Sequence, residues 1–286
     1  MKVRIIIPFF AGLLLATSGG QIDSPVPVAA QQDSEYALPE AGGEHLRVET
    51  GLGPLHVWRP EDFDPRTAGT VVYIHGYYTS VDQTWTDDHL ATQFGDSGRN
   101  ALFIAIEAPQ SNAEEVSWKS LEDLLRTVED RTPFPLPRGP LVVVSYSGGY
   151  RTVLLWLRDP RVQQIILLDG LYAGQAEFRS WLSRSSSAKP HRLVLASIDT
   201  WRQSYRFARR TSGTALRRSI PATASTFSPR ETRARLLYLR SQYEHGEIIS
   251  SGKVIPVLLQ DSPLRALAPD KAESTTALPH KPALHK

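Results

Sequence analysis

A serine-centred segment, from Leu141 to Leu157, carries the clearest sign of chemistry in the sequence. It reads LVVVSYSGGYRTVLLWL: a β-branched apolar run, a turn of small residues, then an apolar stretch at helical spacing. This pattern predicts a strand, a tight turn and a helix, with Ser147 projecting from the turn. Such a turn needs small neighbours, which Gly148 and Gly149 supply. The ordinary alternative is a glycine-tolerant turn between any strand and helix of a parallel α/β protein.

A serine at such a turn could attack a carbonyl carbon if other groups assist it. The hydroxyl is a weak nucleophile at neutral pH, so an imidazole must take its proton and later give it to the leaving group. A carboxylate must hold that imidazole in the right tautomer. The Gly148 amide, at the start of the predicted helix, points toward an oxyanion formed on the substrate. If Ser147 is a nucleophile, it therefore requires a histidine and an acid from elsewhere in the chain.

The elements around this segment alternate between apolar strands and amphipathic helices. Alternation of this kind predicts an α/β fold, a mostly parallel central sheet with helices on both faces. A hairpin is expected over 45–60, ahead of the first crossover. The remaining strands are expected at 70–74, 100–107, 163–168, 192–198 and 235–239, with helices at 87–94 and 117–131, the latter capped by Ser117.

Polar side chains stand where several of these strands end. Asp169 closes the strand after the serine segment, Asp199 closes the next one, and His245 follows the last. Open α/β sheets bind ligands at the carboxyl ends of their strands, so these groups are expected at the same edge of the sheet as Ser147. We favour Asp169 as the acid because the Asp-Gly-Leu-Tyr-Ala-Gly segment looks like a shaped turn. Asp199, followed by Thr200, also fits a helix N-cap, and both acids stay open at this point.

The order of these groups along the chain, serine then acid then histidine, resembles that of the α/β-hydrolase superfamily. The resemblance covers about 46–260. It also rests on two motifs, Ser145-Tyr146-Ser147-Gly148-Gly149 at the turn and His75-Gly76 at an earlier strand end. The first motif is a variant of the family's nucleophile elbow, because Ser145 stands where a glycine is usual. That departure leaves a non-catalytic binding protein with the same sheet as the alternative function.

The resemblance implies a serine hydrolase, an esterase or amidase that works through an acyl-enzyme. Ser147, Asp169 and His245 would be its catalytic residues. The amides of Tyr77 and Gly148 would form its oxyanion hole, where loss of one donor typically costs about 3 kcal/mol of transition-state stabilisation. No cofactor and no metal is expected, since the sequence carries neither a nucleotide-binding glycine loop nor a metal-binding histidine motif.

Aromatic residues gather near the predicted strand ends and predict an aromatic-lined cleft, suited to a sugar, a peptide or an acyl group. His75 lies before Ser147 in the chain, the wrong order for a base in this family, and is expected to be structural. The aromatic residues are Tyr77, Tyr78, Trp85, Tyr146, Tyr150 and Tyr172.

Arginines are concentrated between Trp201 and Arg218, interleaved with aromatic residues. The ordinary interpretation is a solvated helix face with an apolar side. The sharper hypothesis is a small cap segment over the site that attracts an anionic substrate, such as a carboxylate-bearing cell-wall peptide or a lipid headgroup. A basic segment argues against a third function, a surface lipase, which needs a broad apolar lid.

Length and composition limit the classes of protein that remain. The chain of 286 residues suffices for one α/β domain, and its formal net charge of +2 gives no global drive toward nucleic acid. It contains no cysteine, which excludes disulfides, thiolate metal sites and a cysteine nucleophile. Together with the export signal described next, the basic segment makes a small-molecule or cell-envelope substrate the expected partner.

The first 30 residues look like a secretory signal peptide. Lys2 and Arg4 precede an apolar run over 5–16 that is too short for a comfortable membrane span. Cleavage after Ala30 and cleavage near Ser18 both fit, and an uncleaved anchor is the alternative. The sequence thus predicts a secreted or periplasmic protein with no stable membrane span after signal cleavage. Its expected parts are a signal peptide (1–30), a linker (31–44), a hydrolase-like domain (45–260) and a disordered tail (261–286).

Overall fold

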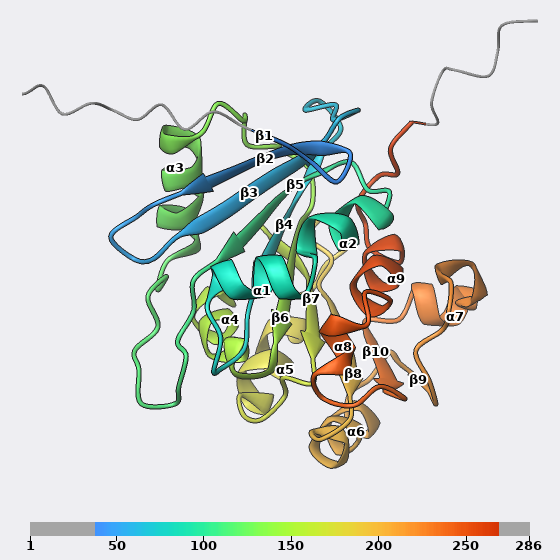
Figure 1. Cartoon of the computed structure of the whole chain (residues 1–286). Helices are drawn as coiled ribbons and strands as arrows, with labels where there is room; N and C mark the ends of the chain where they lie inside the picture. Colours follow the sequence, from blue (N-terminus) through green and yellow to red (C-terminus); the bar gives the residue numbers. More distant parts are fainter. Residues whose placement is uncertain (1–37, 269–286) are drawn as a thin grey trace, which may run out of the picture. The chain divides into compact units, whose positions relative to one another are not determined.

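Ten strands form a single mixed sheet in the computed structural model, which describes residues 38–268 (Figure 1). The strands are β1 (Leu38–Glu40), β2 (Gly43–Val48), β3 (Leu55–Pro60), β4 (Gly69–Ile74), β5 (Ala101–Ile106), β6 (Leu141–Tyr146), β7 (Val162–Leu168), β8 (Arg192–Ser197), β9 (Thr214–Arg217) and β10 (Leu236–Arg240). Their order across the sheet is β1-β2-β3-β5-β4-β6-β7-β8-β10-β9. The pairs from β1 to β5 are antiparallel and all the others are parallel, which confirms the predicted fold class.

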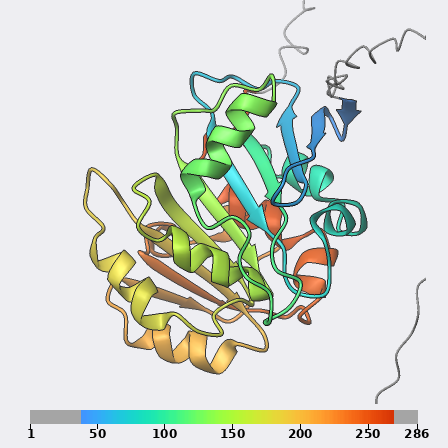
Figure 2. The same ribbon diagram turned by 90° about the vertical axis from the view of Figure 1, so that its left-hand side faces the viewer.

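Helices cover both faces of this sheet (Figures 1 and 2). One face packs α3 (Leu121–Arg131), α4 (Tyr150–Trp156), α5 (Gln175–Ser183) and α6 (Trp201–Arg209). The other packs α1 (Val81–Asp87), α2 (Leu90–Asp96), α8 (Glu247–Ser250) and α9 (Val254–Gln260), while the short α7 (Pro229–Thr232) lies near β9. Among residues 38–268, no helix is both long and apolar enough to cross a bilayer.

The central strands are apolar along their whole length because both of their faces are covered. In β4, Val72 and Ile74 join the core on one side, whereas Val71 and Tyr73 join the core on the other. Alternation of side chains along a strand produces this division. The β-branched runs that predicted buried strands are therefore explained by a sheet with two cores.

Local details differ from the sequence predictions in three places. The single helix expected over 87–94 is two helices, because the chain between α1 and α2 turns at His89 through a left-handed backbone conformation (φ 50°). The N-cap of α3 is Ser120 and not Ser117; the Ser120 hydroxyl accepts a hydrogen bond from the Asp123 amide at 3.2 Å. Strand β9 was not predicted at all.

The folded domain begins earlier than predicted. Residues 38–44, assigned to the linker, contain β1 and the start of β2. Glu40 fixes β1 in place: its backbone carbonyl accepts from the Trp58 indole at 2.8 Å, and its carboxylate lies 2.6 Å from His45 Nδ1 and 3.1 Å from the Trp85 indole nitrogen. The signal-peptide prediction over 1–30 and the linker up to residue 37 lie outside the described residues.

The domain also ends later than predicted. Residues 261–268 were assigned to a disordered tail, but Leu264 is buried and the Asn100 amide donates to the Arg265 carbonyl at 2.9 Å. Asp261 forms an ion pair with Arg192 at 2.5 Å, and the side chains are only 14% and 4% exposed for Arg192 and Asp261, respectively. Residues 261–268 therefore belong to the folded domain, and the rest of the predicted tail, 269–286, lies outside the described residues.

Replacing Asp261 with alanine is expected to lower the free energy of unfolding by about 3 kcal/mol, because it leaves a largely buried guanidinium without its counter-charge. Urea unfolding followed by fluorescence measures the change. The exposed Asp62→Ala variant serves as control and is expected to stay within about 0.5 kcal/mol of the parent. Equal effects of the two substitutions would show that residue 261 is not part of the domain core.

Candidate active site

Ser147 lies directly after β6, at the start of a 3₁₀ turn (Ser147–Gly149) that leads into α4. Its backbone is in the left-handed region, with φ 48°, which is uncommon for a residue with a side chain. The strand, the tight turn and the helix are therefore arranged as the small-residue pattern predicted. Backbone strain of this kind persists only where the surroundings hold it, and it is concentrated at functional sites.

Two glycines allow the loop after β4 to approach this turn closely. A Cβ atom added at Gly148 would lie 2.4 Å from the ring of Tyr77. One added at Gly76 would lie 2.8 Å from the ring of Tyr146 and 2.9 Å from Cβ of Ser147. No side chain fits at those distances, so both positions need glycine for the loop and the turn to meet.

Ser145, the residue that departs from the family pattern, does not disturb this arrangement. It is fully buried, and its hydroxyl has no hydrogen-bond partner among the described residues. A Cβ atom at Gly149 would approach that hydroxyl to 2.9 Å, so the glycine at 149 leaves the room that the serine side chain occupies.

A continuous chain of hydrogen bonds joins Ser147, His245 and Asp169. Nδ1 of His245 lies 2.7 Å from Oδ2 of Asp169, and Nε2 of His245 lies 3.0 Å from Oγ of Ser147. The carboxylate assigns the proton to Nδ1, which leaves Nε2 free to accept from the serine hydroxyl. The structure thus brings together, from the ends of β6, β7 and β10, the three residues that the sequence proposed as a set.

Asp169 is fully buried and is held by donors from the loop after β8. Its carboxylate accepts from the amides of Ile198 (3.1 Å), Asp199 (3.0 Å) and Thr200 (2.9 Å), and from the Thr200 hydroxyl (2.6 Å). Burial on its own raises the pKa of Asp169, but the hydrogen bonds from His245 and Thr200 outweigh it and lower the pKa to about 2. The group therefore carries a full negative charge beside His245 at neutral pH.

Sequence reasoning missed the donors that hold Asp169. It read Asp199 as a candidate N-cap, whereas the N-cap of α6 is Thr200, and the Thr200 hydroxyl donates to Asp169 and makes no capping bond. The only signal in the sequence was a hydroxyl residue close to a strand end, which is too common to be specific.

Asp199, the other candidate acid, lies farther from the imidazole. Its Oδ2 is 3.9 Å from His245 Nδ1, and its side chain is 61% exposed, whereas that of Asp169 is completely buried. Asp169, Asp199 and His245 also form the one group of possible metal ligands among residues 38–268. Because His245 Nδ1 faces Asp169 at hydrogen-bonding distance, we assign these atoms to a hydrogen bond and not to a metal.

Two amides of the loop after β4, those of Tyr77 and Tyr78, differ in their hydrogen bonding. The Tyr78 amide donates to the Gln110 carbonyl at 2.9 Å, so it is occupied. The Tyr77 amide, predicted as an oxyanion donor together with Gly148, has no protein acceptor among residues 38–268. Its ring is fixed against Gly148, and its hydroxyl accepts from Arg151 at 3.2 Å.

His75 has a structural role, as the sequence predicted. The side chain is completely buried, its Nδ1 donates to the Gly76 carbonyl at 2.6 Å, and its Nε2 accepts from the Ala108 amide at 2.9 Å. Both ring nitrogens are used by the backbone, so this histidine braces the loop that carries Tyr77.

A cavity of about 520 Å³ opens beside Ser147. Five of the six aromatic residues expected in a cleft line it, whereas Trp85 is buried elsewhere, stacked on His45 and His56. No Asp, Glu, Lys or Arg side chain belongs to this lining, within the part of the chain that the structure describes. The lining residues are Tyr77, Tyr78, Asn112, Tyr146, Ser147, Gly148, Tyr150, Tyr172 and His245.

No family model matches the sequence, and no curated protein sequence matches it significantly. Solved structures do match. The S-formylglutathione hydrolase from Staphylococcus aureus aligns with 78% of this chain and 99% of its own, at 12% identity and a TM-score of 0.50. A protein designated FAE aligns with 80% of this chain and 92% of its own, at 11% identity and a TM-score of 0.51. The chain has an α/β-hydrolase fold. At this level of identity the likeness establishes the fold and not the activity.

Within the α/β-hydrolase fold, the arginine-rich segment packs against the sheet. Phe207 and Ala208 of α6 are buried in the core, and α6 contacts β8, β9 and β10. None of residues 201–218 lines the cavity beside Ser147. The small cap expected over the site is therefore not formed by this segment, which is the solvated helix of the ordinary interpretation. Its amphipathic pattern alone could not distinguish the two, because both need one apolar face.

The low pKa of Asp169 in this α/β-hydrolase fold predicts a loss of stability in acid. Its pKa is about 2 in the folded protein and 3.8 ordinarily, so the charged form favours folding above about pH 4. This contribution, about 2 kcal/mol, is expected to disappear as the pH falls toward 2. Urea unfolding of the parent and of Asp169→Asn across this range measures it: the difference between the two should shrink by that amount, and a constant difference contradicts the assignment.

Proposed function

We propose that this protein is a serine hydrolase that cleaves an ester or an amide through an acyl-enzyme. The observation that carries the proposal is the hydrogen-bond chain from the Ser147 hydroxyl through His245 to the buried, ionised Asp169. The left-handed backbone at Ser147 and the adjacent cavity support it. The Staphylococcus aureus protein of similar fold is a hydrolase by name, which agrees with this class.

In the proposed mechanism each group has one step. Ser147 Oγ attacks the substrate carbonyl while its proton passes to His245 Nε2, and Asp169 stabilises the imidazolium that forms. The amides of Tyr77 and Gly148 donate hydrogen bonds to the negative charge that develops on the carbonyl oxygen. Collapse of the tetrahedral adduct breaks the bond to the leaving group, which takes the proton from Nε2. Water then attacks the acyl-serine while His245 Nε2 accepts its proton. Collapse of this second adduct breaks the bond to Ser147 Oγ, which takes the proton back from Nε2, and the acid product leaves.

The cavity favours an uncharged substrate that carries a ring, or a chain about as wide as a ring. Five tyrosines provide flat apolar surface with polar edges, and no Lys or Arg side chain among the described residues belongs to the lining. Arg151, which contacts the Tyr77 hydroxyl, also donates to the backbone carbonyls of Ser111 and Glu114. The exposed carboxylate of Asp199 near His245 would also repel an anion. We therefore infer a neutral acyl group or a neutral sugar ester, in place of the anionic substrate first considered.

Export belongs to the proposal as well. Its support is the pattern of Lys2, Arg4 and the apolar run over 5–16. An exported hydrolase would meet esters or amides of the cell envelope, so we propose such a compound as substrate. N-terminal sequencing of the protein recovered from medium, periplasm and cytoplasm tests this part; an intact Met1 in the cytoplasm contradicts it.

The catalytic proposal is tested by intact-mass analysis after reaction with a fluorophosphonate probe, beside Ser147→Ala and His245→Ala. The probe reports an activated serine and needs no knowledge of the substrate. One label per chain in the parent, and none in either variant, supports the proposal. Ser145→Ala is the matched control, because it removes a buried serine two residues away and should leave labelling intact. An unlabelled but folded parent would instead favour a binding protein.

A further inference from the structure

The outer strand β9 leaves one side of the sheet open. It pairs in parallel with β10 and, among residues 38–268, with no other strand. The strand is short, Thr214–Arg217, and Leu216 within it is 39% exposed. An open strand edge presents backbone donors and acceptors that another extended segment can use.

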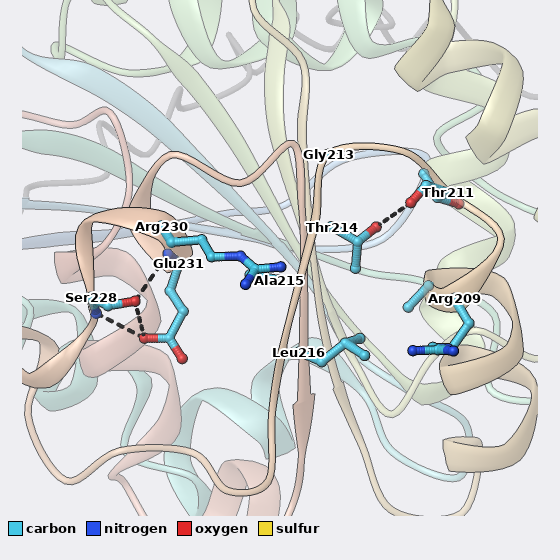
Figure 3. Close-up of a pocket in the computed structure, with 10 residues that line it drawn as sticks. Arg209, Thr211, Gly213, Thr214, Ala215, Leu216, Ser228, Arg230 and Glu231 are labelled. Atoms are coloured by element: carbon cyan, nitrogen blue, oxygen red, sulfur yellow. Dashed lines mark hydrogen bonds between the residues drawn. The ribbon is translucent and has the colours of Figure 1, made fainter.

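A groove of about 590 Å³ runs along this edge. Backbone and side chains of β9 form its floor, the end of α6 borders it on one side, and α7 borders it on the other (Figure 3). Figure 3 shows the side chains of Arg209 and Arg230 on opposite sides of the strand. The groove shares no residue with the cavity beside Ser147.

Backbone register supplies the hydrogen-bonding groups that the groove offers. The Leu236 amide of β10 donates to the Gly213 carbonyl, so residue 213 faces β10. Successive residues of a strand direct their peptide groups to opposite sides. The N–H and C=O groups of Thr214 and Leu216 therefore point away from β10, toward the open edge.

The stretch of chain that forms this edge is strongly cationic. Residues 201–240 contain ten arginines, no lysine and a single acid, Glu231, although the whole chain has a net charge of only +2. Glu231 is already occupied by Arg217 and by Ser228. Arg209 and Arg230 make neither a hydrogen bond nor an ion pair with a side chain within residues 38–268, and both are exposed. The groove thus has cations on both of its walls and no acid free to neutralise them.

We propose that the β9 groove binds an extended acidic segment of a partner protein by strand addition. The partner's backbone would pair with Thr214 and Leu216 and add an outer strand to the sheet. Because side chains of a strand alternate between its faces, acidic residues on one face of the segment would meet Arg209, and those on the other would meet Arg230. The requirement for acids on both faces defines the kind of partner sequence that fits. The proposal does not depend on the catalytic role of Ser147.

A fluorescein-labelled heptapeptide, acetyl-Val-Glu-Glu-Val-Glu-Glu-Val, is a suitable probe, because an extended conformation places glutamates on both faces. Fluorescence anisotropy of this peptide with the full-length protein should show saturable binding. Arg209→Glu/Arg230→Glu should weaken it at least about tenfold, since both flanking cations become anions. Leu216→Pro, which removes one outward-facing donor, should weaken it by a similar factor while the charge stays the same.

Two controls separate strand addition from simple attraction between opposite charges. Arg66→Glu/Arg126→Glu makes the same change of net charge at exposed sites elsewhere and should leave binding within about twofold. A peptide of the same charge with proline at its centre should bind at least about tenfold more weakly. Equal binding of the proline peptide overturns the proposal in favour of a general polyanion surface. Absence of peptide binding, or an equal effect of the control variant, also overturns it. Thermal unfolding of each variant verifies that it is folded.

Discussion

Replacing Ser147 with alanine is expected to lower kcat for a simple aryl ester by about 10⁴-fold or more, and His245→Ala is expected to have an effect of similar size. The reason is that the hydroxyl and the imidazole, 3.0 Å apart, act as one unit: neither can form the acyl-enzyme without the other. The double variant should therefore be no slower than either single variant. Steady-state kinetics with a p-nitrophenyl ester series measures all three.

Ser145→Ala provides the matched control for this experiment. The Ser145 hydroxyl is buried and without a partner among the described residues, so its removal should leave kcat and the unfolding free energy almost unchanged. If the effects of Ser147→Ala and His245→Ala multiply in the double variant, the two side chains act independently and the proposed mechanism is wrong.

Replacing Asp169 with asparagine is expected to lower kcat/KM by about 10³- to 10⁴-fold. The asparagine side chain carries no negative charge to stabilise the imidazolium. Its NH₂ group can also donate a hydrogen bond to Nδ1 of His245, which favours the tautomer that carries its proton on Nε2. The loss should appear in kcat with little change in KM, because Asp169 is fully buried and does not line the cavity. The kinetic constants of the folded variant measure it.

Asp199, the second carboxylate near His245, provides a comparison for the Asp169→Asn variant. Its carboxylate lies 3.9 Å from the same ring nitrogen but is largely exposed, so Asp199→Asn alone should change kcat/KM by no more than about threefold. In the Asp169→Asn background, where Asp199 is the nearest remaining negative charge, the same substitution should cost about a further tenfold. A large loss from Asp199→Asn in the parent would make Asp199 the functional acid and Asp169 its support.

Much of the site could be predicted from sequence because its residues lie at the ends of strands. Apolar runs locate strands locally, and in a parallel sheet the carboxyl ends of the strands meet at one edge. Ser147, Asp169 and His245 could be grouped because each follows a strand and because their order along the chain resembles that of the α/β-hydrolase superfamily. The choice between Asp169 and Asp199 was closer, since both follow strands, and they differ only in features of the folded protein: burial and the distance to the imidazole.

The features that sequence reasoning missed depend on contacts between distant residues or on weak local signals. The boundaries at both ends of the domain rest on Glu40 with Trp85 and on Arg192 with Asp261, pairs that no local pattern connects. Strand β9 has four residues, too few for a periodic pattern to stand out. The break between α1 and α2 rests on the backbone of His89, a residue that can adopt the left-handed region but does not signal it.

The three proposed catalytic residues come from the ends of β6, β7 and β10, and this has a consequence for the folding of the chain. Ser147 and His245 are separated by 98 positions, and the residues between them form β7, β8, β9 and β10. Contacts at such separation carry a higher loop-closure cost than local contacts, and we expect them to form after the local ones. The proposed activity should therefore be the last property that a refolding chain regains, after its secondary structure and most of its core. A newly synthesised chain would then become catalytically active only after β10 has joined the sheet.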